Sequence, residues 1–168
     1  LSEQQADQTE SDAREYNSIS PVPEIGVLSN GNYTVLLNDR GSGFSRYKDI
    51  YLNRYRKISA DHYGNYLFIR NLRSDELWSA TYAPLDQMPN TYHVTFASDK
   101  IRFLRVDGNI ETKTDITVLK DRSAEIRRYT FTNNGNQDAD LELTTYAEVI
   151  LARHNEDESH RVFASMKV

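Results

Sequence analysis

The segment from residue 40 to residue 57, RGSGFSRYKDIYLNRYRK, is the part of the chain richest in groups that could bind a ligand. It holds six basic residues against one acid, and the aromatic residues Phe44, Tyr47, Tyr51 and Tyr55 lie between them. Guanidinium groups donate paired hydrogen bonds to sugar hydroxyls, and aromatic rings pack against the apolar faces of sugars. The same residue types bind single-stranded nucleic acid, and in a solvated strand they simply pair across the sheet. Composition alone leaves these three interpretations open.

Two clusters of carboxylates could in principle cleave a glycosidic bond, which needs a proton donor and a nucleophile or base about 5 to 10 Å apart. They are Asp75-Glu76 and Glu156-Asp157-Glu158. Both lie in sequences typical of solvated turns, and adjacent residues in an extended chain point in opposite directions. Surface charge is the favoured interpretation of both clusters.

Other kinds of chemistry find weaker support. The chain has no cysteine and no Gly-x-Ser-x-Gly segment, and Gly41-Ser42-Gly43 lacks the ending of a phosphate-binding loop. A metal could be bound only by a cluster within residues 154–160, whose spacing matches neither a helical zinc motif nor an EF-hand loop. Its members are His154, Glu156, Asp157, Glu158 and His160. We expect a polar loop there, no metal site and no cofactor.

Short strands must position these groups, because from Pro21 onward apolar residues alternate with polar ones between clusters of Gly, Asn, Asp and Pro. Strands are predicted at 25–29, 33–38, 49–57, 65–71, 76–81, 91–97, 100–106, 110–118, 124–133 and 139–152. In the last of these, the odd-numbered residues from Ala139 to Leu151 are predicted to form the buried face. Turn residues at 107–109 and 133–136 fit hairpins. Without helical stretches between the strands, the predicted fold class is all-β, as a large antiparallel β-sandwich.

The chain length of 168 residues indicates one domain. Residues 1–20 carry a net charge of −4 out of −5 for the whole chain and are poor in large apolar groups. They are predicted to be a polar acidic tail or linker, and residues 21–168 the sandwich domain.

Charge and composition also limit the kinds of partner that this chain is expected to contact. Residues 21–168 are nearly neutral, so neither nucleic acid nor direct membrane contact is expected. No apolar run approaches the roughly 20 residues of a membrane helix. The absence of cysteine fits a reducing compartment, so a cytoplasmic location is expected, and the cytosolic part of an inner-membrane protein fits equally.

Several segments, in order, resemble the N-terminal β-sandwich domain of glycoside hydrolase family 94, from about residue 22 to the C-terminus. They are LSNGNY at 28–33, GSGFSRYKD at 41–49, YLFIR at 66–70, LWSATYAP at 77–84 and YAEV at 146–149. The last two are most similar to the phosphorylase-like domain of cyclic β-1,2-glucan synthases, and cellobiose and chitobiose phosphorylases are more distant relatives.

The resemblance implies a supersandwich of the galactose mutarotase type. In the family, the catalytic acid and the phosphate site lie in an (α/α)6 barrel that follows the sandwich, so this chain alone is expected to be non-catalytic. The family's sandwich continues with further strands beyond the point corresponding to Val168, so a truncated version is expected. An exposed strand edge would then favour a homodimer.

The resemblance further implies that the sandwich supports dimerisation and lines one side of a cleft for a β-linked gluco-oligosaccharide. Arg46, Tyr47 and Asp49 are the first candidates for that contact, with Phe44 and Tyr51 supplying aromatic surface. The family also places a basic residue shortly after a Phe near this C-terminus, whereas here Lys167 is displaced from Phe163. Two alternatives remain: a free-standing carbohydrate-binding module and a purely structural interaction domain.

Overall fold

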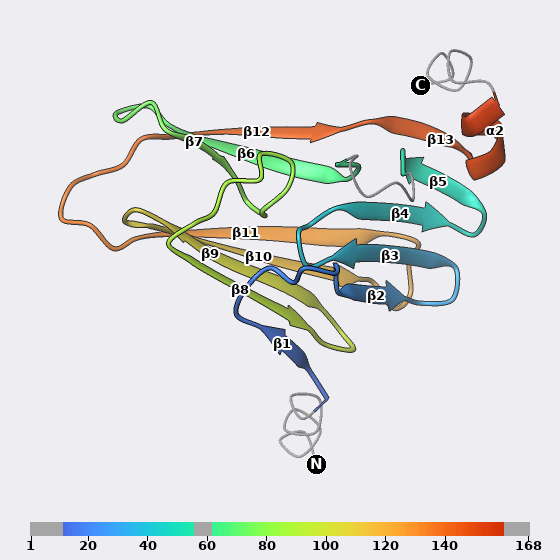
Figure 1. The fold of residues 1–168 in the computed structure, drawn as a ribbon. Coiled ribbons are helices and arrows are strands. Elements are labelled where there is room, and N and C mark those ends of the chain that lie inside the picture. The colour runs from blue at the N-terminus through green and yellow to red at the C-terminus, as the bar shows by residue number, and fades with distance from the viewer. Residues whose placement is uncertain (1–11, 56–61, 160–168) are drawn as a thin grey trace.

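The computed structural model describes residues 12–55 and 62–159, which form thirteen strands and one short helix (Figure 1). The elements are β1 (Arg14–Tyr16), β2 (Ile25–Ser29), β3 (Tyr33–Asn38), β4 (Gly43–Tyr47), β5 (Ile50–Asn53), β6 (Asn65–Asn71), β7 (Leu77–Ser79), β8 (Thr91–Phe96), β9 (Ile101–Asp107), β10 (Ile110–Val118), β11 (Glu125–Asn133), β12 (Leu141–Ala147), β13 (Val149–Arg153) and α2 (His154–Ser159).

The strands pair antiparallel in three sheets. Sheet A has the order β1-β8-β9-β10-β11, sheet B the order β13-β5-β4-β3-β2, and sheet C the order β12-β6-β7. Sheets B and C are joined where β12 leads into β13, and together they form the layer that faces sheet A (Figure 1). The predicted all-β antiparallel sandwich is confirmed.

Two apolar clusters hold the layers together, and both include side chains of sheet A. The first joins β2 and β3 to the centre of sheet A; its fully buried members include Val35, Val94 and Phe103. The second joins β6 and β7 to β10 and contains Ile69, Trp78 and Ile110. Each such side chain alternates with a more exposed neighbour, and its burial contributes about 1.5–3 kcal/mol.

The two-residue period located several strands accurately. The predicted strands at 25–29, 33–38, 65–71 and 110–118 have the observed bounds of β2, β3, β6 and β10. In contrast, β4 was not predicted, because Gly43 and the polar residues after it hide the alternation. The run predicted at 49–57 corresponds to β5, which spans Ile50–Asn53, and residues 56–61 lie outside the described part of the chain.

The long strand predicted at 139–152 is wrong, both in its continuity and in its buried face. In β12, Leu143, Thr145 and Ala147 were predicted to be buried but are exposed, and Leu141 is only half-buried.

The predicted strand is divided at Glu148 into β12 and β13, and the pairing register of β13 shifts between Val149 and Ala152. Leu151 has a φ of 47° in this bulge. The extra residue reverses the side-chain directions, so Ile150 and Ala152 are buried whereas Val149 and Leu151 are about half exposed.

The two ends of the described chain also differ from expectation. The predicted polar loop after β13 is a short helix, α2. Near the other end, β1 lies within the predicted tail and pairs with β8, so β1 forms this edge of sheet A. Residues 1–11 lie outside the described residues, and the domain start expected at residue 21 stays a prediction.

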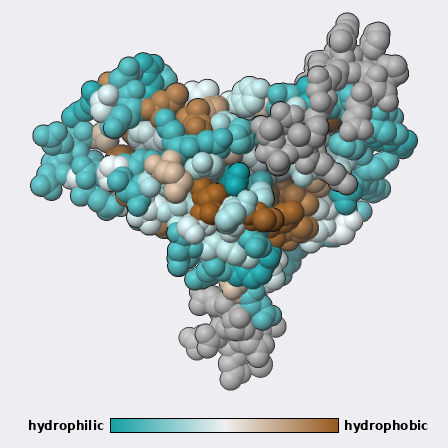
Figure 2. Space-filling model, viewed as in Figure 1, coloured by the Kyte–Doolittle hydropathy of each residue, from teal (hydrophilic) through white to brown (hydrophobic). Residues whose placement is uncertain are grey.

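The molecular surface is largely hydrophilic in the view of Figure 2, where hydrophobic residues gather in separate small patches. Among the described residues, no helix has the length and apolar character to cross a membrane.

Candidate functional site

The ligand-binding residues predicted in the basic and aromatic segment lie on or beside the hairpin formed by β4 and β5. Lys48 and Asp49 make the turn, and Lys48 adopts a φ of 52° there. Tyr47 pairs with Ile50 across the hairpin, which places Arg46 directly opposite Tyr51. The close spacing of the basic and aromatic residues in the sequence therefore becomes a cross-strand contact.

Side-chain alternation assigns these residues to two faces of sheet B. Ser45 points toward sheet A, because its hydroxyl donates a hydrogen bond of 2.6 Å to Glu125 of β11. Phe44 and Arg46, its neighbours along β4, therefore lie on the opposite, outer face together with Tyr51. Tyr47 lies on the same side of β4 as Ser45.

Aromatic rings cluster on this outer face. The ring centroid of Phe44 lies 4.8 Å from that of Tyr51 and 4.9 Å from that of Tyr55, and the ring of Tyr51 lies 5.5 Å from His154. Only 8% of Phe44 is exposed, so it packs against the two tyrosines, which are themselves half-buried. We call Phe44, Arg46, Tyr51 and Tyr55 the aromatic–arginine face.

Arg46 stands out electrostatically. It is half-buried, yet within the described residues its guanidinium makes no hydrogen bond or ion pair, and its Nε is buried without a partner. An unsatisfied buried donor carries a free-energy cost of about 1–3 kcal/mol. The two Nη atoms of Arg46 are not buried in this way, so hydroxyl oxygens of a ligand beside Tyr51 can accept hydrogen bonds from them.

Tyr47 and Asp49 are not part of this face. Tyr47 is 40% exposed, and Lys48 Nζ lies 5.2 Å from the centre of its ring. The carboxylate of Asp49 forms an exposed ion pair of 2.7 Å with Arg153 of β13. Of the five predicted residues, the structure thus brings together Phe44, Arg46 and Tyr51, and direct ligand contact by any of the five stays a prediction.

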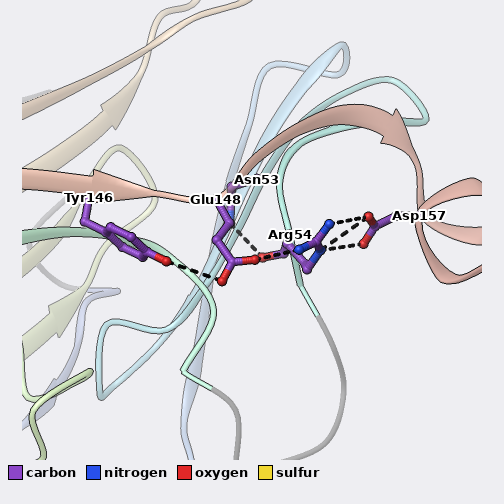
Figure 3. A network of polar contacts seen from close by, with 5 residues as sticks. All are labelled: Asn53, Arg54, Tyr146, Glu148 and Asp157. Carbon is purple, nitrogen blue, oxygen red and sulfur yellow. Dashed lines mark hydrogen bonds and ion pairs between the residues drawn. The ribbon is translucent and has the colours of Figure 1, made fainter. Parts of the chain in front are cut away.

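A polar network beside the aromatic–arginine face was not predicted (Figure 3). The guanidinium of Arg54 donates to both carboxylate oxygens of Asp157 in α2, with Nε 2.9 Å and 3.3 Å from them and Nη2 2.8 Å from Oδ1, and it donates one hydrogen bond of 2.7 Å to Glu148. Tyr146 reaches the other oxygen of Glu148 at 3.4 Å. The hydrogen bond from Arg54 to Asp157 is the main reason that the pKa of Arg54 is raised further above its already high usual value.

This network fixes the position of α2, and with it His154, against the edge of sheet B. Asn53 supports it from the strand side: its amide donates to the carbonyl of Gly43, and its Oδ1 accepts from the backbone N–H of Ser45. No single sequence could have shown the network, because Arg54 is separated from its two partners by 94 and 103 residues. Tyr55 could have been found, since it belongs to the same aromatic series.

The two carboxylate clusters considered in the sequence analysis each contain an aspartate that forms an ion pair in the structure. Asp157 is occupied by Arg54, and Asp75 forms an exposed ion pair with Arg70 across the turn between β6 and β7. Across residues 12–55 and 62–159, no three His, Asp or Glu side chains gather as ligands for a metal ion; His160 lies outside these ranges. What the aromatic–arginine face can do chemically is donate hydrogen bonds beside aromatic rings.

Comparison with known proteins identifies a family whose fold matches the one observed. The family model described as glycosyl hydrolase 94, supersandwich domain, matches residues 13–168. The chain is also similar to the cyclic beta-(1,2)-glucan synthase NdvB of Rhizobium meliloti (strain 1021), with 34% identity over 145 residues. That match covers 85% of this chain and 5% of the relative, so the chain spans about a twentieth of the relative's length. The chain belongs to the glycosyl hydrolase 94 supersandwich domain family.

Proposed function

We propose that this chain is a non-catalytic, carbohydrate-associated domain of a larger β-glucan-processing enzyme, of the cyclic β-1,2-glucan synthase or glucan phosphorylase type. The observation that carries the proposal is the similarity to a cyclic beta-(1,2)-glucan synthase over 85% of this chain. In this proposal the reaction takes place in an (α/α)6 barrel of the same parent chain, on the cytoplasmic side of the membrane.

The aromatic–arginine face is the proposed contact with a β-linked gluco-oligosaccharide. An unpaired guanidinium beside a tyrosine ring offers both kinds of interaction that a sugar uses: hydrogen bonds to hydroxyls and packing against C–H groups. Tyr47 and Asp49, at the end of the same hairpin, are proposed to contact the parts of the oligosaccharide that extend beyond this face.

A homodimer is the second element of the proposal. It draws support from sheet edges: within the described residues, β11 pairs only with β10, and β12 pairs only with β6. Unpaired strand edges associate with other strands unless they are covered. Sedimentation of the chain should give a single species of twice 19.4 kDa, and a purely monomeric chain would remove this element.

The size of the native polypeptide tests whether the domain belongs to a larger enzyme. An antibody raised against the 168-residue chain should detect a band far above 19.4 kDa in a lysate of the source cells. A band at 19.4 kDa would contradict the proposal and favour a free-standing carbohydrate-binding module.

A further inference from the structure

The sandwich is open along the side where β11 and β12 run. Within the described residues, β11 is the last strand of sheet A and β12 the last strand of sheet C, and Figure 1 shows β12 above β11. A groove of about 260 Å³ lies between them, lined by residues of both strands that include Tyr129 of β11 and Thr145 of β12. We call β11, β12 and this groove the open side. Its two strand edges face each other across the groove.

The opposite side of the sandwich is closed by the chain itself. There β1 pairs with β8 of sheet A, and the guanidinium of Arg14 in β1 donates a hydrogen bond of 2.6 Å to the carbonyl of Ile25 in β2 of sheet B. The ring of Tyr16 lies 5.8 Å from that of Phe96. One short strand thus connects both layers on that side, whereas within residues 12–55 and 62–159 no strand does so at the open side.

Apolar side chains that point into the sandwich remain uncovered at the open side. Leu143 of β12 pairs with Ile69 of β6, which is fully buried in the core that faces sheet A. The side chain of Leu143 is therefore directed inward, yet 48% of the residue is exposed. Tyr129 and Phe131 of β11 pack against the same core and are only half-buried. Because sandwich layers are stabilised by burying such side chains, the open side lacks its cover.

The free edge of β11 has the features of a strand that can pair with another. It is nine residues long, pairs with β10 in one continuous register and contains no proline, whereas protected edges are commonly short, bulged or interrupted by proline. Its inward-pointing charge, Arg127, is already bonded to Glu125 at 2.7 Å and to the carbonyl of Asn65 at 2.9 Å. The main-chain groups along this edge can therefore extend sheet A by β-augmentation.

The charges of β11 favour one register for pairing with a second β11 strand. Two copies related by a two-fold axis perpendicular to the sheet pair antiparallel, and the axis must pass through a residue position so that inner faces continue into inner faces. An axis at Arg127 or Arg128 would place two arginines opposite each other, which is destabilising. With the axis at Tyr129, all nine residues pair, and Arg128 lies opposite Thr130 of the other copy.

We propose that the open side is an interface with a second copy of this chain, related by a two-fold axis through Tyr129 and perpendicular to the sheets. The two five-stranded sheets A then form one continuous sheet. Because Tyr129 and Thr145 line the same groove, the same axis brings the two β12 edges together in the other layer and covers Leu143.

A second copy suits the open side better than a single added strand, because it supplies a partner for both layers at the same spacing and is self-complementary. The inference rests on the homodimer of the proposed function and states where it forms. It does not involve the aromatic–arginine face, none of whose residues lines the groove.

The chain has no cysteine, so pairs of introduced cysteines can test the interface. Ile126 and Thr132 are exposed, and in the proposed register each lies opposite the other in the partner copy, within reach of a disulfide. The experiment mixes the Ile126→Cys and Thr132→Cys variants of the 168-residue chain, oxidises them mildly and identifies cross-linked products by intact mass. The mixed disulfide is expected as the main product. Each variant alone should cross-link poorly, because its two cysteines would be about 20 Å apart, six residues along the strand.

Sedimentation of the same samples separates the possible failures. A dimer in which the mixed disulfide is no more abundant than the two like disulfides would overturn this inference and leave the homodimer of the proposed function standing. A monomeric chain would overturn both, and would leave the open side to a strand of the parent enzyme. The proposed glucan contact is unaffected by either result, because it is tested separately with Arg46→Ala.

A matched pair of charge variants tests the register. Thr130→Glu places a carboxylate opposite Arg128 of the partner copy, and Thr130→Arg places a like charge there, twice in each dimer by symmetry. We expect the dissociation constant of the dimer to be about tenfold lower for Thr130→Glu than for Thr130→Arg, as measured by sedimentation. Equal dissociation constants for the two variants would overturn the proposed register.

Discussion

Arg54 of β5 and Asp157 of α2 form a two-point ion pair across 103 residues of chain, with Nε 2.9 Å from Oδ2 and Nη2 2.8 Å from Oδ1. Asp157 is almost fully buried, and Arg54 is largely so. The pair attaches the last described helix to the sheet that carries the aromatic–arginine face (Figure 3).

Replacing Arg54 should therefore destabilise the domain strongly. Arg54→Met leaves a buried carboxylate without its partner, a change that costs about 3–5 kcal/mol of unfolding free energy. Urea unfolding followed by circular dichroism measures this. The control Arg153→Met breaks the exposed pair with Asp49 and should cost about 0–1 kcal/mol. Similar losses in the two variants would show that burial of the Arg54 pair is not what matters.

Asp115 of β10 should make stability depend on pH in the acidic range. Burial raises the pKa of its carboxyl, but hydrogen bonds from Arg102 and Arg128 outweigh this, so the pKa is below the ordinary 3.8. Because the unfolded chain takes up the proton first as the pH falls, the stabilisation is complete above 3.8 and is lost as the pH falls through the lower pKa of the folded state.

The Asp115→Asn variant measures that contribution. At neutral pH we expect it to lose about 2 kcal/mol, the value of hydrogen bonds to a charged group. The difference from the parent chain should shrink at about pH 3, as measured by urea unfolding at both values. Asp121→Asn, at an exposed position, should show little difference at either pH. A loss for Asp115→Asn that stays constant with pH would refute the assignment.

Gly43 should be irreplaceable for steric reasons. A Cβ at this position would lie 1.9 Å from the backbone carbonyl oxygen of Leu36, on the paired strand β3. Gly43→Ala should separate β3 from β4, at a cost of more than about 3 kcal/mol. Gly108→Ala is the matched control, because its Cβ would meet nothing within 4 Å and only its φ of +57° would be strained, at about 1 kcal/mol. Thermal unfolding of the two variants compares these costs, and equal melting temperatures would contradict the steric explanation.

The sequence predicted those elements whose faces differ clearly in polarity. In β10, Ile110, Thr112, Thr114 and Ile116 are buried and alternate with polar residues, so the period of two was visible. In β13 the same rule failed, because the bulge at Leu151 reversed the faces, and a bulge leaves no sign in a hydrophobic pattern.

The candidate site was predictable only in part, for a related reason. Phe44, Arg46 and Tyr51 are close in the sequence, and a hairpin brings them together on one face. The polar network around Arg54 was not predictable, because its partners Glu148 and Asp157 lie 94 and 103 residues away in the sequence and meet Arg54 only in the folded chain.

The central claim, that the aromatic–arginine face binds a β-linked gluco-oligosaccharide, is tested most directly by calorimetric titration of the 168-residue chain with linear β-1,2-gluco-oligosaccharides. The account predicts saturable binding that Arg46→Ala weakens about tenfold or more, since hydrogen bonds from a charged group contribute about 1.5–3 kcal/mol. The exposed Arg122→Ala should bind like the parent chain, and Arg46→Lys should recover only part of the loss because it lacks the planar guanidinium. No saturable binding to the parent chain, or equal binding by an Arg46→Ala variant with an unchanged circular dichroism spectrum, would contradict the account.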